Sequence, residues 1–521
     1  MSDPRRELTA ADLVIRALSQ PAAQPAILLG DSVLTVGALR EQVSRISQAY
    51  ASMDIGAGSP VAVLSSNRPE VVAVGQANQV SGVRSLALHP YGSLDDHAYV
   101  VDDAEIETLV FDPGPYSERA AQLLERCPRL SRLLAMGPSD VGGDLMAAAE
   151  RFTPRPLRAP DVDPDGVSGL SYTGGTTGRP KGVMGTYRGA TRMTMIQMAE
   201  WDIPAAPRFL ISTPLSHAGA AFLTPTLLRG GALVVLPGFD PERFLDAVQR
   251  HRVTATMLVP TMIYALLDHA GLDHADLSSL EAVYYGASAI SPVRLREAIE
   301  RLGPVFFQFY GQAECPMAIT ALRREEHLVD DPGRLATCGR PVPWVRAGLF
   351  DDDMNEVGPG QPGEICVQSP MVMKGYWNKP EETAEAFRGG WLHTGDVATA
   401  DEQGYLTIVD RKKDMIVTGG FNVYPREVED VIGTHPAVAQ VAVIGVPDDR
   451  WGESVKAVVV VRPGADVDSR DLIDLVKERK GSVYAPKSVD FSERIPVTGL
   501  GKPDKKALRD LYWGTAARRV N

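Results

Sequence analysis

The sequence predicts an α/β protein in which a large N-terminal domain of parallel and mixed sheets precedes a small α+β C-terminal domain. Short apolar, strand-like runs alternate with helical patterns over most of the chain, and such alternation indicates parallel sheets joined by crossover helices. The chain has 521 residues, which is too long for one ordinary domain. Its apolar content of 44% supplies ample material for sizeable cores.

The elements expected up to about residue 310 follow this alternation. Strands are expected at Val61–Ser65, Arg84–Leu88, Phe209–Pro214, Ala232–Leu236, Ala255–Val259, Leu280–Tyr285 and Val305–Phe309. Helices are expected at Pro69–Val80, at Pro241–Arg252 and from Ser291-Pro292 to Gly303. In the last of these helices Leu295, Ile299 and Leu302 lie on one face, as a helix packed against a sheet requires.

The predicted pattern of secondary structure changes twice towards the C-terminus. From about residue 335 to 410, short strands and Gly/Pro turns predict a β-rich subdomain. After Arg411 a compact βα pattern follows, with a strand at Val455–Val461 and a helix at Ser469–Lys480. We therefore expect an N-terminal domain at 1–412 and a C-terminal domain at 413–521.

Charge and cysteine usage narrow the class of protein. The formal net charge of −13 argues against a broad nucleic-acid surface, because a polyanion would be repelled. The four cysteines are far apart without metal-ligand spacing, which fits a reducing compartment. The first twenty residues have no apolar core of a signal peptide, and no apolar run approaches the roughly 18 residues of a membrane span. A cytoplasmic location is expected.

A glycine-rich segment, from Tyr172 to Gly182, is the most informative stretch for function. Its four glycines let the backbone bend and approach a ligand closely, and its hydroxyl and N–H groups can cradle phosphate oxygens. The residues expected to contact the phosphates are Thr173, Gly174, Gly175, Thr176, Thr177, Gly178 and Lys181. The segment is not a Walker P-loop, because Pro180 precedes the lysine and Gly182 follows it.

Four further segments, together with this loop, resemble the ordered signatures of the adenylate-forming superfamily, which includes acyl-CoA synthetases, peptide-synthetase adenylation domains and firefly luciferase. They are Tyr310-Gly311-Gln312-Ala313-Glu314, Thr394-Gly395-Asp396, Asp410–Asp414 with Gly419–Asn422, and Pro496–Lys502. The likeness covers nearly the whole chain. It implies an AMP-forming acid–thiol ligase that uses ATP, Mg²⁺, coenzyme A and a small-molecule carboxylic acid.

The resemblance also implies roles for residues around the nucleotide. Glu314 would hold Mg²⁺, Thr176 and Thr177 would grip the triphosphate, and Lys502 would stabilise charge that develops during adenylation. Asp396 would accept hydrogen bonds from the ribose, with support from Arg411. Adenine would lie between the backbone of Gly286-Ala287-Ser288 and the ring of Tyr310. The remaining contacts would come from the residues that follow this tyrosine, which are Gly311, Gln312 and Ala313.

The same resemblance places the acyl group and coenzyme A. His217 would border the acyl pocket and gate it, and Lys413 would be the hinge about which the C-terminal domain rotates after adenylation. Gly419 and Gly420 would border the tunnel for the pantetheine arm. The pocket is expected to be lined by His217–Phe222, Tyr284–Ala287 and Cys315–Ile319, mostly small to medium apolar residues that favour a hydrophobic acid.

One departure from the family pattern matters. Ala313 stands where the family usually has threonine, and losing a hydroxyl that contacts the α-phosphate costs about 1 to 4 kcal/mol. One alternative is therefore a ligase, weak in or lacking adenylation, that thioesterifies a supplied acyl-adenylate. Two others are a stand-alone adenylation enzyme that loads a carrier-protein thiol and a non-catalytic nucleotide-binding protein. The identity of the acid and the formation of a homodimer are left open.

Overall fold

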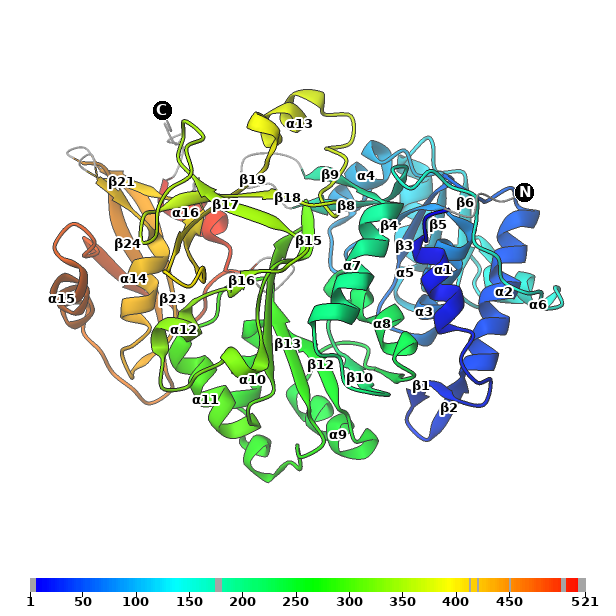
Figure 1. Ribbon diagram of the computed structural model, residues 1–521, viewed down its shortest axis with the longest axis horizontal. Helices are drawn as coiled ribbons and strands as arrows, with labels where there is room; N and C mark the ends of the chain where they lie inside the picture. Colours follow the sequence, from blue (N-terminus) through cyan, green and yellow to red (C-terminus); the bar gives the residue numbers. More distant parts are fainter. Residues whose placement is uncertain are drawn as a thin grey trace.

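The computed structural model describes residues 6–173, 180–411, 414–418, 421–448, 451–497 and 503–513. Four sheets organise this part of the chain, with the N-terminal sheets on the right and centre of Figure 1 and the C-terminal sheet on the left. The predicted α/β class is confirmed. No helix in the described ranges combines the length and the apolar character needed to cross a membrane.

The first sheet has seven strands in the order β7-β6-β5-β3-β4-β8-β9. Its neighbouring strands are parallel except for β8 and β9, which form an antiparallel hairpin. The strands are β3 (Pro60–Leu64), β4 (Arg84–Ala87), β5 (Thr108–Phe111), β6 (Arg132–Ala135), β7 (Gly143–Asp144), β8 (Val167–Thr173) and β9 (Lys181–Thr186). The helices between them are α3 (Pro69–Ser81), α4 (Leu94–Asp103), α5 (Pro113–Arg126) and α6 (Leu145–Glu150).

The second sheet has nine strands in the order β16-β15-β14-β13-β12-β10-β11-β1-β2. Its strands are β1 (Pro25–Leu29), β2 (Ser32–Thr35), β10 (Arg208–Ile211), β11 (Ala232–Val235), β12 (Ala255–Leu258), β13 (Ala282–Gly286), β14 (Phe306–Gln312), β15 (Cys315–Leu322) and β16 (Arg340–Pro341). Its helices are α8 (Leu223–Leu228), α9 (Pro241–His251), α10 (Pro260–Leu267) and α11 (Pro292–Leu302), with a 3-10 turn at Ala218–Phe222. The strand predicted at Phe209–Pro214 ends at Ile211, because the chain turns there into a loop.

Helices α1 (Ala10–Ala17) and α7 (Tyr187–Glu200) lie between these two sheets, and α2 (Val36–Ser52) lies at the far right of the view (Figure 1). They share one apolar core with both sheets. Trp201, at the end of α7, is fully buried and stacks on Phe309 with ring centroids 5.0 Å apart. This packing fixes α7 against the strands whose ends carry the predicted nucleotide residues.

The C-terminal part contains two smaller sheets. The four-stranded antiparallel sheet is β17 (Arg346–Phe350), β18 (Gly363–Gln368), β19 (Leu392–Ala400) and β20 (Leu406–Arg411), with α12 (Pro332–Ala336) and α13 (Pro380–Ala386) nearby in sequence. The last sheet contains β21 (Ile416–Thr418), β22 (Phe421–Val423), β23 (Val438–Asp448), β24 (Gly452–Val461) and β25 (Ser488–Phe491). Its helices are α14 (Pro425–Ile432), α15 (Ser469–Lys480) and α16 (Lys505–Trp513). The domain boundary at 412/413 stays a prediction.

Candidate active site

The glycine-rich segment connects the two strands of the β8–β9 hairpin. Thr173 and Lys181 face each other across this hairpin. The predicted phosphate contacts Gly174, Gly175, Thr176, Thr177 and Gly178 lie outside the described residues.

Both ends of this connection are anchored to helix α4. The Tyr172 hydroxyl donates a hydrogen bond to the Asp103 carboxylate at 2.6 Å, and the Tyr99 hydroxyl donates one to the Pro180 carbonyl at 3.0 Å. Burial, and then the hydrogen bond to Asp103, raise the pKa of Tyr172, so its hydroxyl keeps the proton that it donates.

Glu314 lies in the tight turn between β14 and β15. Only 8% of this residue is exposed, so it is not a solvated carboxylate at a strand end. Gly311 allows the turn to close, because a Cβ atom at this position would lie 2.3 Å from the Met317 nitrogen and 2.7 Å from the Cys315 carbonyl oxygen. Met317 itself has a left-handed backbone with φ of 56°. The turn therefore holds the carboxylate at a buried edge of the nine-stranded sheet.

The segment 371–377, which we call the strap, brings Glu314 and Lys181 to one place. The Tyr376 hydroxyl donates to Glu314 Oε1 at 2.9 Å, and Lys181 Nζ lies 5.0 Å from the centroid of the Tyr376 ring. The sequence interpretation missed Tyr376. The run Lys374-Gly375-Tyr376-Trp377 offered a local signal, but nothing in its spacing linked it to the nucleotide residues.

Three predicted nucleotide residues meet at β19 and β20. Asp396 is 5% exposed, accepts a 2.6 Å hydrogen bond from the Tyr310 hydroxyl and lies 3.1 Å from Arg411 Nε. Burial, and then Asp396, raise the pKa of Tyr310 well above its usual range. Asp396 also raises the pKa of Arg411. The Gln312 side-chain amide donates to the Thr394 carbonyl at 3.2 Å, which ties the end of β14 to β19.

The predicted adenine segment, Gly286-Ala287-Ser288, begins at the last residue of β13, which pairs with β14. A Cβ atom on Gly286 would lie 2.3 Å from the Phe309 carbonyl oxygen, which precedes Tyr310. Ala287 has φ of 66°, a left-handed conformation that costs a non-glycine residue about 1 kcal/mol or more. Such strain is often found at ligand sites, and it accords with a backbone held close to a ligand.

His217 belongs to a separate group of side chains at the end of β10. Its Nδ1 lies 2.8 Å from Ser216 Oγ, and its ring meets the His89 ring edge-on with centroids 4.9 Å apart. Buried Asn67 holds this loop by donating to the Thr213 carbonyl and accepting from the Leu215 N–H. The loop is thus fixed from two sides, and the role of His217 as a gate stays a prediction.

The predicted residues of the C-terminal part, Lys413, Gly419, Gly420 and Lys502, lie outside the described residues. The described residues nearby are held by charge. Lys505 Nζ is 2.9 Å from the Glu429 carboxylate and 3.8 Å from that of Asp410. Arg426, in α14, donates to the Ile290 carbonyl at 3.2 Å and so links the last sheet to the nine-stranded sheet.

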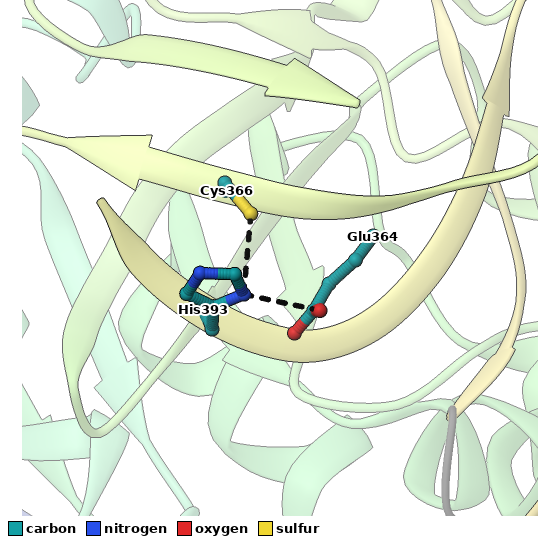
Figure 2. Close-up of side chains that lie close together, drawn as sticks. All are labelled: Glu364, Cys366 and His393. Atoms are coloured by element: carbon teal, nitrogen blue, oxygen red, sulfur yellow. Dashed lines mark hydrogen bonds and ion pairs between the residues drawn. The ribbon is translucent and has the colours of Figure 1, made fainter. Parts of the chain in front are cut away.

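A separate cluster is formed by Glu364, Cys366 and His393, on β18 and β19 (Figure 2). Their potential metal-ligating atoms all lie within 4.8 Å of one another. The two His393 ring nitrogens, however, lie 3.1 Å from Glu364 Oε2 and 3.1 Å from the Arg388 carbonyl. Each ring nitrogen therefore already has an oxygen atom within hydrogen-bond distance, and these contacts account for the cluster without a metal ion. Glu364 also accepts from the Gly395 N–H at 2.9 Å and thereby holds the part of β19 that carries Asp396.

The donor set at Glu314 fits a magnesium ion. Mg²⁺ is usually bound by one or two carboxylates together with substrate phosphates and waters. Tyr376 occupies Oε1, whereas Oε2 makes no hydrogen bond with any other residue in the described ranges. Oε2 of Glu314, the residue that the resemblance to the superfamily predicts to hold Mg²⁺, thus remains available as an oxygen ligand.

The sequence model of the AMP-binding enzyme family matches residues 15–377, and that of the AMP-binding enzyme C-terminal domain matches residues 427–502. The chain belongs to the AMP-binding enzyme family. The predicted superfamily is thereby confirmed. A medium/long-chain-fatty-acid–CoA ligase of Mycobacterium tuberculosis is 53% identical over 98% of this chain and 91% of its own length. A feruloyl-CoA synthase of an Amycolatopsis species is 37% identical over 96% of this chain and 98% of its own.

Two solved structures with similar sequences agree with the fold. The amide bond synthetase of Marinactinospora thermotolerans matches with a TM-score of 0.89 and 37% identity, covering 96% of this chain and 100% of its own. The o-succinylbenzoate CoA synthetase of Bacillus subtilis, in complex with its acyl-adenylate, matches with a TM-score of 0.83 and 27% identity, covering 99% and 100%. The proteins similar to this chain thus include CoA ligases and an amide bond synthetase.

Proposed function

We propose that this enzyme is an ATP-dependent acyl-CoA ligase that activates a hydrophobic carboxylic acid as an acyl-adenylate and transfers the acyl group to coenzyme A. The proposal rests on one observation: three groups lie together where adjoining sheets meet. They are Lys181, Glu314, and Asp396 with its partners Tyr310 and Arg411. It is supported by the ligase relative that is 53% identical over nearly the whole chain.

The first half-reaction joins two anions. A carboxylate oxygen of the acid attacks the α-phosphorus of ATP, the bond to the bridging oxygen breaks, and pyrophosphate leaves. Lys181 and Arg411 supply positive charge near the phosphates and the ribose, and Asp396 orients the sugar by accepting its hydroxyl protons. Mg²⁺, when bound at Glu314, neutralises part of the phosphate charge. Lys502 is proposed to reach the carboxylate and the α-phosphate during this step.

The second half-reaction replaces AMP by a thiol. The coenzyme A sulfur attacks the acyl carbon, loses its proton, and AMP leaves with the oxygen that had joined carbon to phosphorus. We propose that the domain after residue 412 turns about Lys413 between the two steps, so that Gly419 and Gly420 line the thiol entrance. The hydrogen bonds from Arg426 to the Ile290 carbonyl and to the Asp410 carboxylate cross this boundary, and bonds of this kind can break at small cost.

The proposed acyl pocket favours an apolar chain or ring. The three stretches expected to line it supply apolar and aromatic side chains such as Phe222, Cys315 and Ile319. A medium or long fatty acid is the first choice because of the 53% identical relative, and an aromatic acid is the second because of the feruloyl-CoA synthase.

A panel of fatty and aromatic acids, incubated with ATP and Mg²⁺, tests this proposal. Parallel reactions receive coenzyme A, a pantetheinylated carrier protein or a simple amine, and mass spectrometry follows acyl-AMP and each acylated product. We expect acyl-CoA and AMP, formed fastest with a fatty acid. If the acylated carrier protein or the amide forms and acyl-CoA does not, coenzyme A is not the acceptor. If none of the acids causes AMP to form, the ligase assignment is contradicted.

A further inference from the structure

We propose that Tyr376 is a positioning residue that holds the Glu314 carboxylate in the orientation in which it receives the metal–nucleotide complex. This inference rests on the proposed function, because it assumes that Glu314 serves the metal. It adds a residue outside the five sequence motifs. The observation behind it is that one tyrosine contacts both Glu314 and Lys181.

The hydrogen bond to Glu314 has a fixed direction. An ionised carboxylate can only accept, so the Tyr376 hydroxyl donates its proton to Oε1 over 2.9 Å. With Oε1 held in this way, the carboxylate cannot rotate freely, and Oε2 keeps one orientation.

The backbone of the strap explains why this tyrosine is well placed. On one side, the Trp377 N–H donates to the Gly182 carbonyl at 2.7 Å and so attaches the strap to β9. On the other side, the Met373 N–H donates to the Glu314 carbonyl at 2.8 Å. The Tyr376 N–H is itself bound to Thr383 Oγ1 at 2.9 Å. The strap thus joins the seven-stranded sheet to the β14–β15 turn, with Tyr376 between the two attachments.

The ring and the hydroxyl of Tyr376 have separable effects. The Lys181 ammonium lies over the aromatic face, which attracts a cation. Phenylalanine would keep this contact and remove only the bond to Glu314. Leucine would remove both. Partners that orient metal ligands typically change metal affinity or activity by about 10- to 100-fold when they are mutated.

The experiment measures metal affinity rather than turnover. Mn²⁺ replaces Mg²⁺, a non-hydrolysable ATP analogue replaces ATP, and the electron paramagnetic resonance signal of free Mn²⁺ reports binding. We expect Tyr376→Phe to weaken Mn²⁺ binding by about 10-fold or more. Tyr376→Leu should weaken it at least as much and should also weaken binding of the nucleotide analogue without metal.

Tyr405→Phe is the matched control. Tyr405 is 6% exposed and its hydroxyl donates to the Glu326 carboxylate at 2.5 Å, so the change removes a comparable tyrosine–glutamate bond elsewhere. It should leave Mn²⁺ affinity unchanged. An unchanged Mn²⁺ affinity in a folded Tyr376→Phe variant would overturn the inference, as would an equal loss in the control. If the wild-type enzyme forms no acid-dependent AMP, the proposed function fails instead, and the binding measurement still decides the role of Tyr376.

Discussion

Ala313 precedes Glu314 in the β14–β15 turn, and its methyl group brings no hydrogen-bond donor to the site. A threonine hydroxyl there would aim a donor at the charge that develops on the α-phosphate, which is worth about 1 to 4 kcal/mol. We therefore predict that Ala313→Thr speeds adenylation by about tenfold to a thousandfold. Acid-dependent exchange of pyrophosphate into ATP measures this step, and thiolysis of synthetic acyl-AMP should not change.

Ala313→Val provides the control for this substitution, because valine has the shape of threonine without its hydroxyl. Valine should give no acceleration. Exchange that stays the same in the threonine variant would show that the missing hydroxyl does not limit the first half-reaction.

His327 makes a pH-dependent contribution to stability. It is 7% exposed, its Nδ1 lies 2.7 Å from the Arg323 carbonyl and its Nε2 lies 2.9 Å from the Tyr285 hydroxyl. Burial lowers its pKa from the ordinary 6.5 to about 4. The unfolded chain therefore binds the extra proton first, and stability present above pH 6.5 is lost as the pH falls towards about 4.

The loss from this one group is at most about 3 kcal/mol. Urea unfolding of the wild type and of His327→Gln, followed between pH 7 and pH 4.5, measures it. The variant should begin less stable and lose less stability on acidification. If the free energy of unfolding fell equally with pH in the two proteins, the loss could not be assigned to His327.

At the scale of elements, the sequence predicted the positions of strands and helices better than it predicted the contacts between them. Apolar runs placed β13 and β14, and the helix predicted at Ser469–Lys480 coincides with α15, because these signals depend on neighbouring residues. The β14 strand extends to Gln312, three residues beyond its predicted end at Phe309, since pairing with β15 continues past the apolar run. The sequence did not predict the role of the strap, because its backbone hydrogen bonds to Gly182 and Glu314 join segments that are far apart in the sequence.

The β14–β15 turn gives a prediction at this scale. In Gly311→Ala, the added Cβ would meet backbone atoms at 2.3 and 2.7 Å, and backbone cannot give way as a flexible side chain can. We expect a lower melting temperature, a loss of about 1 to 3 kcal/mol, and weaker binding of the ATP analogue. Gly75→Ala is the control, because a Cβ in α3 would meet nothing within 4 Å among the described residues. A Gly311→Ala protein as stable as that control would refute the packing argument.

At the scale of the whole molecule, the candidate site forms where separate sheets approach one another (Figure 1). The order of the motifs predicted the family, and the structure added the contacts that join Lys181 to Glu314 and Tyr310 to Asp396. The sequence could name these residues through resemblance, but their separation along the chain hid the contacts. A site assembled in this way suits chemistry in which one acyl group must meet ATP first and a thiol afterwards.

The central claim is that the acid passes through an acyl-adenylate, and the fate of its carboxyl oxygens tests this most directly. A fatty acid labelled with 18O in both carboxyl oxygens is incubated with the enzyme, ATP, Mg²⁺ and coenzyme A, with Lys502→Ala as the control for adenylation. Because the attacking oxygen stays on phosphorus when the thiol displaces AMP, each AMP should carry one labelled oxygen. AMP without label, or label found in inorganic phosphate together with ADP, would contradict the account.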